Sequence, residues 1–468
     1  MSKVAVAKLP TIKPPKRVDD NPKSSPKQAL TIIDALDDPS LFAPWFTGDT
    51  WNGWRAILKA AFHLPMNEDE IAFFKSVAGD RDVPTDVVRE LWAIAGRRAG
   101  KDSIVSAVAA FAAAMFSQQA RLRPGERGLV MCLAVDREQA KILLNYVRSY
   151  FIDIPLLAGM VQRETANGFE LSNGIDVSVA TSNFRSVRGR AILLCVFDEL
   201  AFFRDESTTK PDVELYKAIT PALATLAPNS MIIGISSPYR KAGLLYQKYK
   251  THFGRNDDVL IIQAPTRLLN PTVDPAIIDR ALEDDPAGAK AEWLAEFRDD
   301  IGGWISVELI EAAVENGTTV RAPSTLHHTY VSGCDPSGGA RDSFTAAIAH
   351  AENGVAILDC LIEIRPPFNP TEAVSQIASM LKAYNLKETT GDRYAAQWVV
   401  AAFETLGINY KHSERDRSAI YSDALPLFTS GRARILDNSK LISQFSSLER
   451  RTSAIGKYRI DHGSGGHD

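Results

Sequence analysis

After Pro84 the sequence alternates between short apolar runs and longer stretches with helical spacing of apolar residues. The clearest helical stretches are residues 103–118, 136–151, 211–226 and 274–299. Strands that alternate with helices are typical of a mainly parallel sheet with helices on its faces. The sequence therefore predicts an α/β fold for this part of the chain. The apolar runs predicted as strands are residues 91–95, 128–134, 175–180, 191–197, 230–235 and 259–263.

A second alternating pattern begins after residue 327. Residues 329–334, 344–350 and 355–362 are predicted as consecutive strands, and a helix is predicted at 370–384. Paired glycines and a polar segment precede this pattern and favour a linker, while the Lys- and Pro-rich N-terminus favours disorder. We expect a disordered arm at 1–28, a first domain at 29–300 with a helical N-terminal part, a linker at 301–327 and a second domain at 328–468.

Composition narrows the class of protein. Hydrophobic residues make up 45% and charged residues 24% of the 468 residues, as in soluble globular proteins. The longest nearly uninterrupted apolar stretch, residues 104–116, is shorter than the roughly 20 residues that span a bilayer. The N-terminus lacks the pattern of a signal peptide, and the 4 cysteines form no C-x-x-C pair. We therefore expect a cytosolic protein, and the net charge of −4 leaves nucleic-acid binding open.

The segment between the predicted strand at 91–95 and the predicted helix at 103–118 resembles a phosphate-binding loop. A Gly-rich loop that leads into a helix binds phosphates through backbone N–H groups, and Lys101 would reach the β- and γ-phosphates of ATP. The motif G-x-x-x-x-G-K-[ST] is matched in part, because Ala95 replaces the first glycine and Asp102 replaces the hydroxyl residue. The alternative is a basic turn that caps a helix. The predicted ATP-binding residues are Gly96, Arg97, Arg98, Ala99, Gly100, Lys101, Asp102 and Ser103.

The predicted strand at 191–197 delivers two carboxylates at its carboxyl end. Hydrolysis of a nucleotide needs one acid to hold Mg²⁺ and a second group to position the attacking water. Asp198 suits the metal-binding role and Glu199 the catalytic role, whereas a solvated loop start is the alternative. The next strand ends in Ser236-Ser237-Pro238, which suits a coupling element that responds to the γ-phosphate. The arginine-finger candidates are Arg137 and Arg188, for which the alternative is an ordinary surface arginine.

Carboxylates also follow predicted strands of the second domain. Asp335 ends its first strand, Asp392 ends a later strand, and Asp468 is the last residue of the chain. Three strands followed by a helix and a further strand, with acids in this order, predict an RNase H-like nuclease. Such an enzyme uses two Mg²⁺ ions held by oxygen ligands. Asp342 and Asp359 are further acids that either substitute in this site or are merely solvated.

Taken together and in this order, these motifs resemble the large terminase subunit of tailed bacteriophages. The resemblance covers about residues 40–468. It implies a P-loop (RecA/ASCE-like) ATPase domain followed by an RNase H-like nuclease domain. It rests on the loop at 96–101, on Phe197-Asp198-Glu199, Ser236-Ser237-Pro238, Gly333-Cys334-Asp335-Pro336 and Gly391-Asp392-Arg393-Tyr394, on residues 418–421 and 427–434, and on the closing His467-Asp468.

The resemblance also implies what such a protein does and what it binds. We expect ATP-driven translocation of double-stranded viral DNA into a procapsid and endonucleolytic cleavage of concatemeric DNA. The implied cofactors are ATP and Mg²⁺, with Mn²⁺ as a substitute in the nuclease site. The implied partners are double-stranded DNA, a portal protein, a small terminase subunit and further copies of the chain in a ring, usually a pentamer. No membrane is implied. The protein is expected in the host cytoplasm and transiently at the procapsid portal, not as a stable virion component.

The sequence departs from the family pattern at two places. Asp102 stands where the family usually has Ser or Thr, and family members commonly continue past the final His-Asp with a second Asp and a helix. We therefore expect either a truncated nuclease domain or a third metal ligand at the very end of the chain. Two alternative functions remain. One is a helicase-like or repair ATPase fused to an RNase H-like nuclease, and the other is an inactive prophage remnant that only binds DNA.

Overall fold

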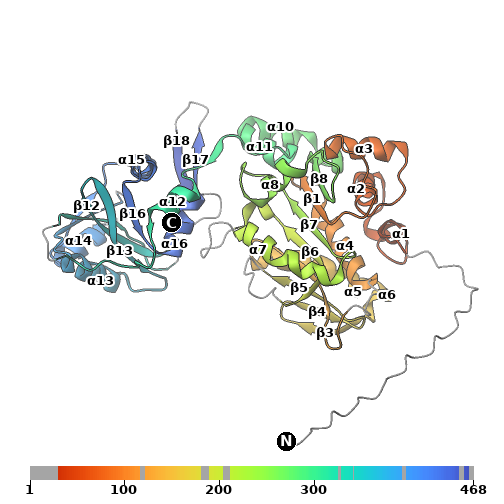
Figure 1. Cartoon of the computed structure of the whole chain (residues 1–468), viewed down its shortest axis with the longest axis horizontal. Coiled ribbons are helices and arrows are strands. Elements are labelled where there is room, and N and C mark those ends of the chain that lie inside the picture. The colour runs from red at the N-terminus through yellow and green to blue at the C-terminus, as the bar shows by residue number, and fades with distance from the viewer. Residues whose placement is uncertain are drawn as a thin grey trace, which may run out of the picture.

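The computed structural model contains two α/β units among its described residues, each built around its own sheet (Figure 1). The predicted arm at 1–28 lies outside the described residues. Of the helices that the structure describes, none combines the length and the apolar character needed to cross a membrane. The structure describes residues 30–115, 122–180, 189–203, 211–324, 328–340, 342–392, 397–452 and 458–462.

The first sheet has the strand order β3-β4-β5-β2-β6-β7-β1-β8. From β5 to β8 in this order neighbouring strands are parallel, whereas β3 and β4 form an antiparallel hairpin at one edge. The part β2-β6-β7-β1-β8 has the order of RecA-like P-loop ATPases, so the predicted fold class is confirmed. The strands are β1 (Glu90–Ala95), β2 (Gly128–Leu133), β3 (Val161–Thr165), β4 (Gly168–Leu171), β5 (Ile175–Ala180), β6 (Ala191–Asp198), β7 (Met231–Ser236) and β8 (Val259–Ala264).

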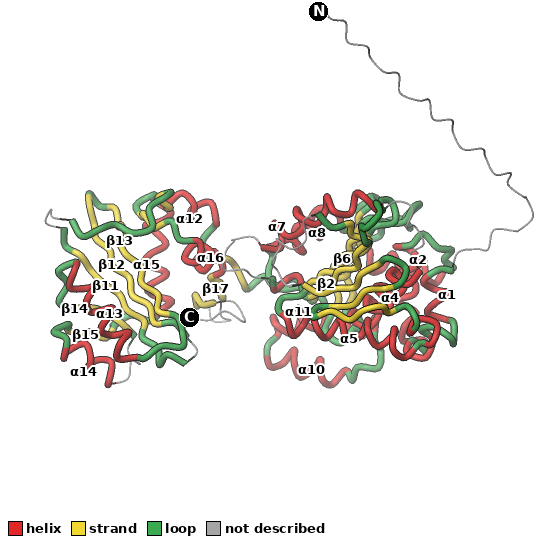
Figure 2. Tube along the Cα trace, turned by 90° about the horizontal axis from the view of Figure 1, so that it is seen from below, coloured by secondary structure: helices red, strands yellow, loops and turns green. Residues whose placement is uncertain are grey.

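Both faces of this sheet are buried, which explains why its strands are continuous apolar runs. Successive residues of a strand point to opposite faces. In β1, Leu91 and Ala93 belong to the core beneath α4 and α5, whereas Trp92 belongs to the core on the side of α7 and α8. Figure 2 shows helices on both sides of these strands. A Cβ on Gly234 of β7 would lie 2.1 Å from the Trp92 ring, so only glycine leaves room for this indole.

The helices of the first unit follow the predicted pattern with shifted ends. The predicted helix at 274–299 is two helices, because Asp285 ends the first and caps the N-terminus of the second. The predicted helix at 211–226 continues beyond α7 as a 3₁₀ helix, Thr220–Leu226. The α-helices are α1 (Ile32–Asp37), α2 (Asn52–Ala61), α3 (Glu68–Ala78), α4 (Lys101–Met115), α5 (Arg137–Asp153), α6 (Pro155–Ala158), α7 (Pro211–Ile219), α8 (Gly243–His252), α9 (Thr266–Leu269), α10 (Pro275–Asp284) and α11 (Pro286–Leu294).

The second sheet has the strand order β10-β16-β13-β12-β11-β14-β15. The strands β11, β12 and β13 form an antiparallel meander, and β14 and β15 continue the sheet parallel to β11. This is the strand order of an RNase H-like fold, as predicted. The strands are β10 (Val314–Glu315), β11 (Tyr330–Asp335), β12 (Phe344–Glu352), β13 (Val355–Ile364), β14 (Glu388–Gly391), β15 (Asn409–His412) and β16 (Ala433–Leu436). The helices are α12 (Val307–Ala313), α13 (Pro370–Ala383), α14 (Gln397–Thr405), α15 (Arg417–Thr429) and α16 (Ser439–Ser447).

A small antiparallel sheet joins the segment between the two units to the late hairpin of the chain. The segment predicted as a linker, residues 301–327, contains β9 (Ile301–Gly303), α12 and β10. Strand β9 pairs with β17 (Leu448–Thr452), which pairs in turn with β18 (Tyr458–His462). Tyr239, which follows β7 in the first unit, donates a 2.7 Å hydrogen bond from its hydroxyl to Oε2 of Glu449 on β17. Both residues are buried, so this contact ties the first unit to the late hairpin.

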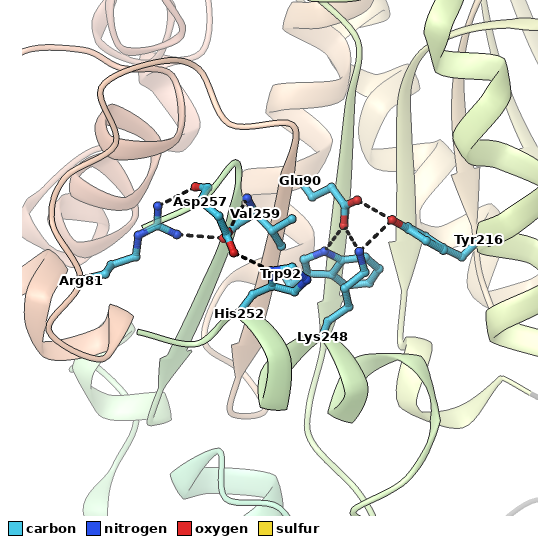
Figure 3. Close-up of polar contacts among 8 residues, drawn as sticks. All are labelled: Arg81, Glu90, Trp92, Tyr216, Lys248, His252, Asp257 and Val259. Atoms are coloured by element: carbon cyan, nitrogen blue, oxygen red, sulfur yellow. Dashed lines mark hydrogen bonds and ion pairs between the residues drawn. The ribbon is translucent and has the colours of Figure 1, made fainter. Parts of the chain in front are cut away.

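A buried ion pair ties the beginning of β1 to the helices on one face of the sheet. The Glu90 carboxylate accepts hydrogen bonds from Trp92 Nε1 at 2.7 Å, from the Tyr216 hydroxyl at 2.6 Å and from Lys248 Nζ at 2.6 Å. The Lys248 ammonium also lies 4.2 Å from the centre of the Tyr216 ring. Figure 3 shows these groups converging from β1, α7 and α8. The same view shows Arg81, which donates to the carbonyl oxygens of Asp257 and Val259.

We predict that Lys248→Met lowers the free energy of unfolding by about 3 kcal/mol, because it leaves the Glu90 carboxylate buried without its cation. Urea-induced unfolding measures this loss. The double variant Glu90→Gln/Lys248→Met removes both charges and should lose less than the single variant. Lys250→Met, an exposed change on the same helix, serves as the control and should alter stability by less than about 0.5 kcal/mol. Equal losses for Lys248→Met and Lys250→Met would contradict the prediction.

Candidate functional site

The predicted phosphate-binding loop connects the end of β1 to the first turn of α4. The backbone reverses through left-handed conformations at Arg98 (φ 64°) and Gly100 (φ 83°). At Gly96 a Cβ would lie 2.2 Å from Thr266 Oγ1, so glycine is required for this close approach. Side chains from elsewhere in the fold hold the loop carbonyl groups: Trp54 Nε1 donates to Ala99 at 2.7 Å, and Thr266 Oγ1 and Asn270 Nδ2 donate to Arg97 and Arg98, both at 2.8 Å.

The loop is thus arranged as an anion site. The first N–H groups of an α-helix have no carbonyl partner within the helix, and the helix dipole adds positive potential there. At the beginning of α4, Lys101 adds a full positive charge, and its side chain is buried. Phosphate groups bind in this setting in many nucleotide-binding proteins.

Lys101 contacts predicted residues from two neighbouring strands. Its Nζ lies 2.8 Å from Glu199 Oε1 and donates a 3.4 Å hydrogen bond to Ser237 Oγ. Glu199 Oε2 accepts from Ser236 Oγ and from the Ser237 N–H, both at 3.3 Å. Burial opposes the charge on Lys101, but the Glu199 carboxylate outweighs it and raises the pKa of Lys101. The lysine, the predicted catalytic acid and the serines of the predicted coupling element therefore form one cluster.

Two further carboxylates lie beside this cluster. Asp198, the last residue of β6, is only 5% exposed, and Asp102 lies in the first turn of α4. Of the described residues, none forms a hydrogen bond with Oδ1 of either side chain. Burial, followed by the charges of Asp102 and Glu199, raises the pKa of Asp198 to about 8. Burial also raises the pKa of Asp102.

The cluster borders a cavity of about 850 Å³. This volume lies within the range of small-molecule sites, which is roughly 300–1,000 Å³. Beyond the predicted residues, Gln139, Ile142 and Tyr146 of α5 and Trp51 line the cavity. The exposed side chains of Ile142 and Tyr146 offer apolar surface suited to a base or a sugar.

The remaining predictions for this site are only partly covered by the structure. Pro238 follows the two serines at the end of β7, and its position beside the cluster is as expected from the sequence. Arg188 lies outside the described residues. Arg137 begins α5, between the cavity residues Asp136 and Gln139, but its side chain is outside the described part. The role of each arginine stays a prediction.

In the second unit, two predicted acids follow neighbouring strands. Cys334 of β11 is paired with Gly391 of β14 in parallel register, so Asp335 and Asp392 leave the same edge of the sheet. Tyr410 of β15 lies beside both: its hydroxyl donates to the Asp392 carbonyl at 3.4 Å. Burial, then the charges of Cys334, Asp392 and Asp335, raises the pKa of Tyr410. A Cβ on Gly391 would lie 2.1 Å from the Tyr410 hydroxyl, so the close packing requires glycine.

A cavity of about 270 Å³ opens beside Asp335. Two residues that the sequence analysis did not single out line it: Glu363 of β13 and Lys440 of α16, whose Nζ donates to Glu363 Oε1 at 2.7 Å. His462 of β18 lines it as well. No local motif marks Glu363 or Lys440, because they meet only through the pairing of β13 with β12 and the packing of α16.

The other acids considered for this site are placed differently. Asp468 lies outside the described residues. Asp342 is exposed. Asp359 is buried on β13, where its Oδ2 lies 2.7 Å from Nδ1 of His350, four residues before Glu363. Within the described ranges, no group of three or more His, Cys, Asp or Glu residues is arranged to hold a metal ion.

Comparisons with known proteins gave matches only among solved structures. No family model matches the chain, and no curated protein does. The chain is similar to the HK97 bacteriophage large terminase (15% identity, 87% of this chain and 95% of that chain, TM-score 0.39). It is also similar to a large terminase from a thermophilic bacteriophage in complex with ADP (12%, 80% and 90%, 0.38). A third match is the large terminase nuclease from thermophilic phage G20c with bound magnesium (17%, 35% and 90%, 0.30).

The buried Asp198 predicts a pH dependence of stability. The pKa is about 8 in the folded protein and about 3.9 in an unfolded chain, so the folded protein binds the proton more tightly. The contribution of this group is therefore fully present below about pH 4 and is lost as the pH rises to about 8. Asp198→Asn removes the dependence, so it should raise Tm relative to the unchanged protein, and by more at pH 8 than at pH 5.5.

Thermal unfolding of both proteins at the two pH values, without nucleotide or metal, measures this difference. Glu138→Gln, an exposed acid of α5, is the control and should show the same small change at both pH values. A Tm difference for Asp198→Asn that does not grow between pH 5.5 and pH 8 would contradict the prediction.

Proposed function

We propose that the chain is a large terminase subunit that hydrolyses ATP to move double-stranded DNA into a viral procapsid and cuts concatemeric DNA. The observation that carries this proposal is the presence of two distinct sites on one chain. The first is the cluster of Lys101, Glu199 and Ser237 at the strand ends of a RecA-like sheet. The second is the pair Asp335 and Asp392 at neighbouring strand ends of an RNase H-like sheet. A motor joined to a nuclease accounts for both.

In the first site each group has a role that suits ATP hydrolysis. Lys101 would exchange its contact with Glu199 for the β- and γ-phosphates, and this exchange frees Glu199 to orient the attacking water. Ser236 and Ser237 contact Glu199, so they would respond when the γ-phosphate leaves. Asp198 and Asp102 would hold the Mg²⁺ that accompanies ATP, since their buried Oδ1 atoms find no hydrogen-bond donor among the described residues. When bound, Mg²⁺ neutralises phosphate charge.

In the second site Asp335 and Asp392 would hold the metal ions of the nuclease, and Asp468 is proposed as a third ligand. Carboxylate oxygens suit Mg²⁺, with Mn²⁺ as a substitute. When bound, a pair of such ions activates water and stabilises the leaving oxygen of a phosphodiester. Glu363 and Lys440 border the same cavity and would face the DNA backbone.

The proposed partners follow from this function. They are double-stranded DNA, a portal protein, a small terminase subunit and further copies of the chain in a ring, proposed as a pentamer. The proposed location is the host cytoplasm, with transient attachment to the procapsid portal. Among the described residues there is one RecA-like sheet, and residues 330–436 form the RNase H-like sheet. This arrangement favours a packaging motor over a helicase with two RecA-like lobes.

We predict that Lys101→Ala reduces DNA-stimulated ATP turnover at least about 100-fold, because the phosphates lose their principal cation in a buried site. Release of inorganic phosphate measures the rate. The control is Lys141→Ala, which changes an exposed lysine of α5 and should leave the rate as it is. Equal rates for the two variants would refute the assignment of the nucleotide site, and no turnover by the unchanged protein would favour the inactive remnant.

We predict that Asp335→Asn abolishes metal-dependent cutting of supercoiled plasmid, because the nuclease site loses one of its two carboxylates. Conversion to nicked and linear forms with Mg²⁺ or Mn²⁺ is measured on agarose gels. Asp342→Asn, an exposed acid of the same unit, is the control and should cut normally. If Asp335→Asn cut as well as this control, the proposed nuclease site would be wrong.

A packaging assay separates the motor from a helicase. Procapsids, DNA and ATP are mixed with the protein, and DNA that has entered the capsid is measured as DNA protected from an added nuclease. Protection that depends on procapsids and on Lys101 supports the motor. ATP-dependent strand separation without such protection would support the helicase-like alternative.

A further inference from the structure

The position of Asp102 is the most unusual feature of the nucleotide site. In the motif G-x-x-x-x-G-K-[ST] the residue after the lysine supplies a neutral hydroxyl to Mg²⁺. Here the same position carries a carboxylate, in the first turn of α4 and in the wall of the 850 Å³ cavity. An acid at this point is close to where the phosphates of a nucleotide would bind, so it would repel them if nothing neutralised it.

The neighbouring groups do not neutralise all of the negative charge. Lys101 forms an ion pair with Glu199, so its charge is balanced by that contact. Arg98, the other cation whose charge acts on Asp102, is an exposed side chain of the loop. Two carboxylates, those of Asp102 and Asp198, therefore share this buried region without a dedicated cation for each. Charges of this kind are costly to bury unless they are paired or bind a metal.

A second, independent observation points to a ligand at the same place. The Asp198 side chain is 95% buried, and its Oδ1 has no hydrogen-bond partner among the described residues; the same is true of Asp102 Oδ1. Buried polar atoms are almost always hydrogen-bonded, so an unpartnered carboxylate oxygen on each side calls for an explanation. A divalent cation satisfies two such oxygens at once, because it takes several oxygen ligands.

We propose that Asp102 and Asp198 form a two-carboxylate site that binds Mg²⁺ or Mn²⁺ before any nucleotide is present. This inference rests on the proposed ATP site. Mg²⁺ in nucleotide sites is ordinarily held by one or two carboxylates together with the substrate phosphates, and affinity rises with the number of charged ligands. With two carboxylates from the protein, the cation is retained by the chain itself. The phosphates then enter a site whose acid is already neutralised.

The inference has two consequences of opposite sign. Replacing Asp102 with the hydroxyl residue of the common motif removes a charged ligand, so Mn²⁺ binds more weakly without nucleotide. The same replacement removes a charge that repels phosphate, so metal-free ADP binds more tightly. A side chain that served only to shape the loop would not produce both effects.

The test uses the full chain with Asp335→Asn and Asp392→Asn, so that the proposed nuclease site does not bind metal. Free Mn²⁺ is measured by electron paramagnetic resonance without nucleotide. We expect about one bound Mn²⁺ per chain, weakened at least tenfold by Asp102→Ser and by Asp198→Asn. ADP binding in EDTA, followed by calorimetry, should be tighter for Asp102→Ser than for the parent. Glu138→Gln, which changes an exposed acid of α5, is the matched control and should change neither value.

The outcomes separate this inference from the proposed function. If Mn²⁺ does not bind without nucleotide, or binds equally well to Asp102→Ser, the two-carboxylate site is wrong even where Lys101→Ala abolishes ATP turnover. Asp102→Asn, which keeps the size of the side chain, guards against a folding defect of the serine variant and should also weaken Mn²⁺ binding. Loss of binding in Asp198→Asn alone would reduce the site to the single acid of an ordinary nucleotide site and would overturn the role of Asp102.

Discussion

The parallel arrangement of β2, β6, β7 and β1 is the constraint on which the first site depends. Parallel strands end at the same edge of a sheet, so the residues that follow them are brought together whatever their separation in sequence. This arrangement places Lys101, at the beginning of the helix after β1, beside Glu199 after β6 and Ser237 after β7. Burial of both sheet faces keeps the strands in register and excludes water from the ends where these charges meet.

The same arrangement has a cost in stability. Asp198 is held in a setting that favours its neutral form, and Asp102 likewise. An interior designed for stability alone would place apolar or neutral residues at these positions. Residues that burial disfavours cluster at functional sites because the ligand, and not the fold, satisfies them. Glu199 adds to this picture, since its backbone is left-handed with φ of 50°, a conformation unusual for a residue other than glycine.

Much of the fold could be predicted from the sequence, and the failures have physical causes. Strands buried on both faces are apolar runs and were visible; β3 was missed because Val161–Thr165 is mostly exposed and carries charges. The helix predicted at 274–299 is interrupted because an aspartate followed by proline ends one helix and begins another. In the sites, residues within motifs could be named in advance. Thr266, Asn270, Glu363 and Lys440 could not, because only tertiary packing brings them to the loop or to the second cavity.

The contact between Tyr239 and Glu449 bears on how the two sites communicate. Tyr239 is separated from Ser237 by one proline, and Glu449 is a wholly buried residue of β17. Strand β17 pairs with β18, whose last residue, His462, lines the cavity beside Asp335. A continuous path of a hydrogen bond and a paired strand thus leads from the serines that contact Glu199 to the border of the second cavity. The nucleotide site and the second cavity are mechanically joined, and neither is free to rearrange without loading this one tyrosine.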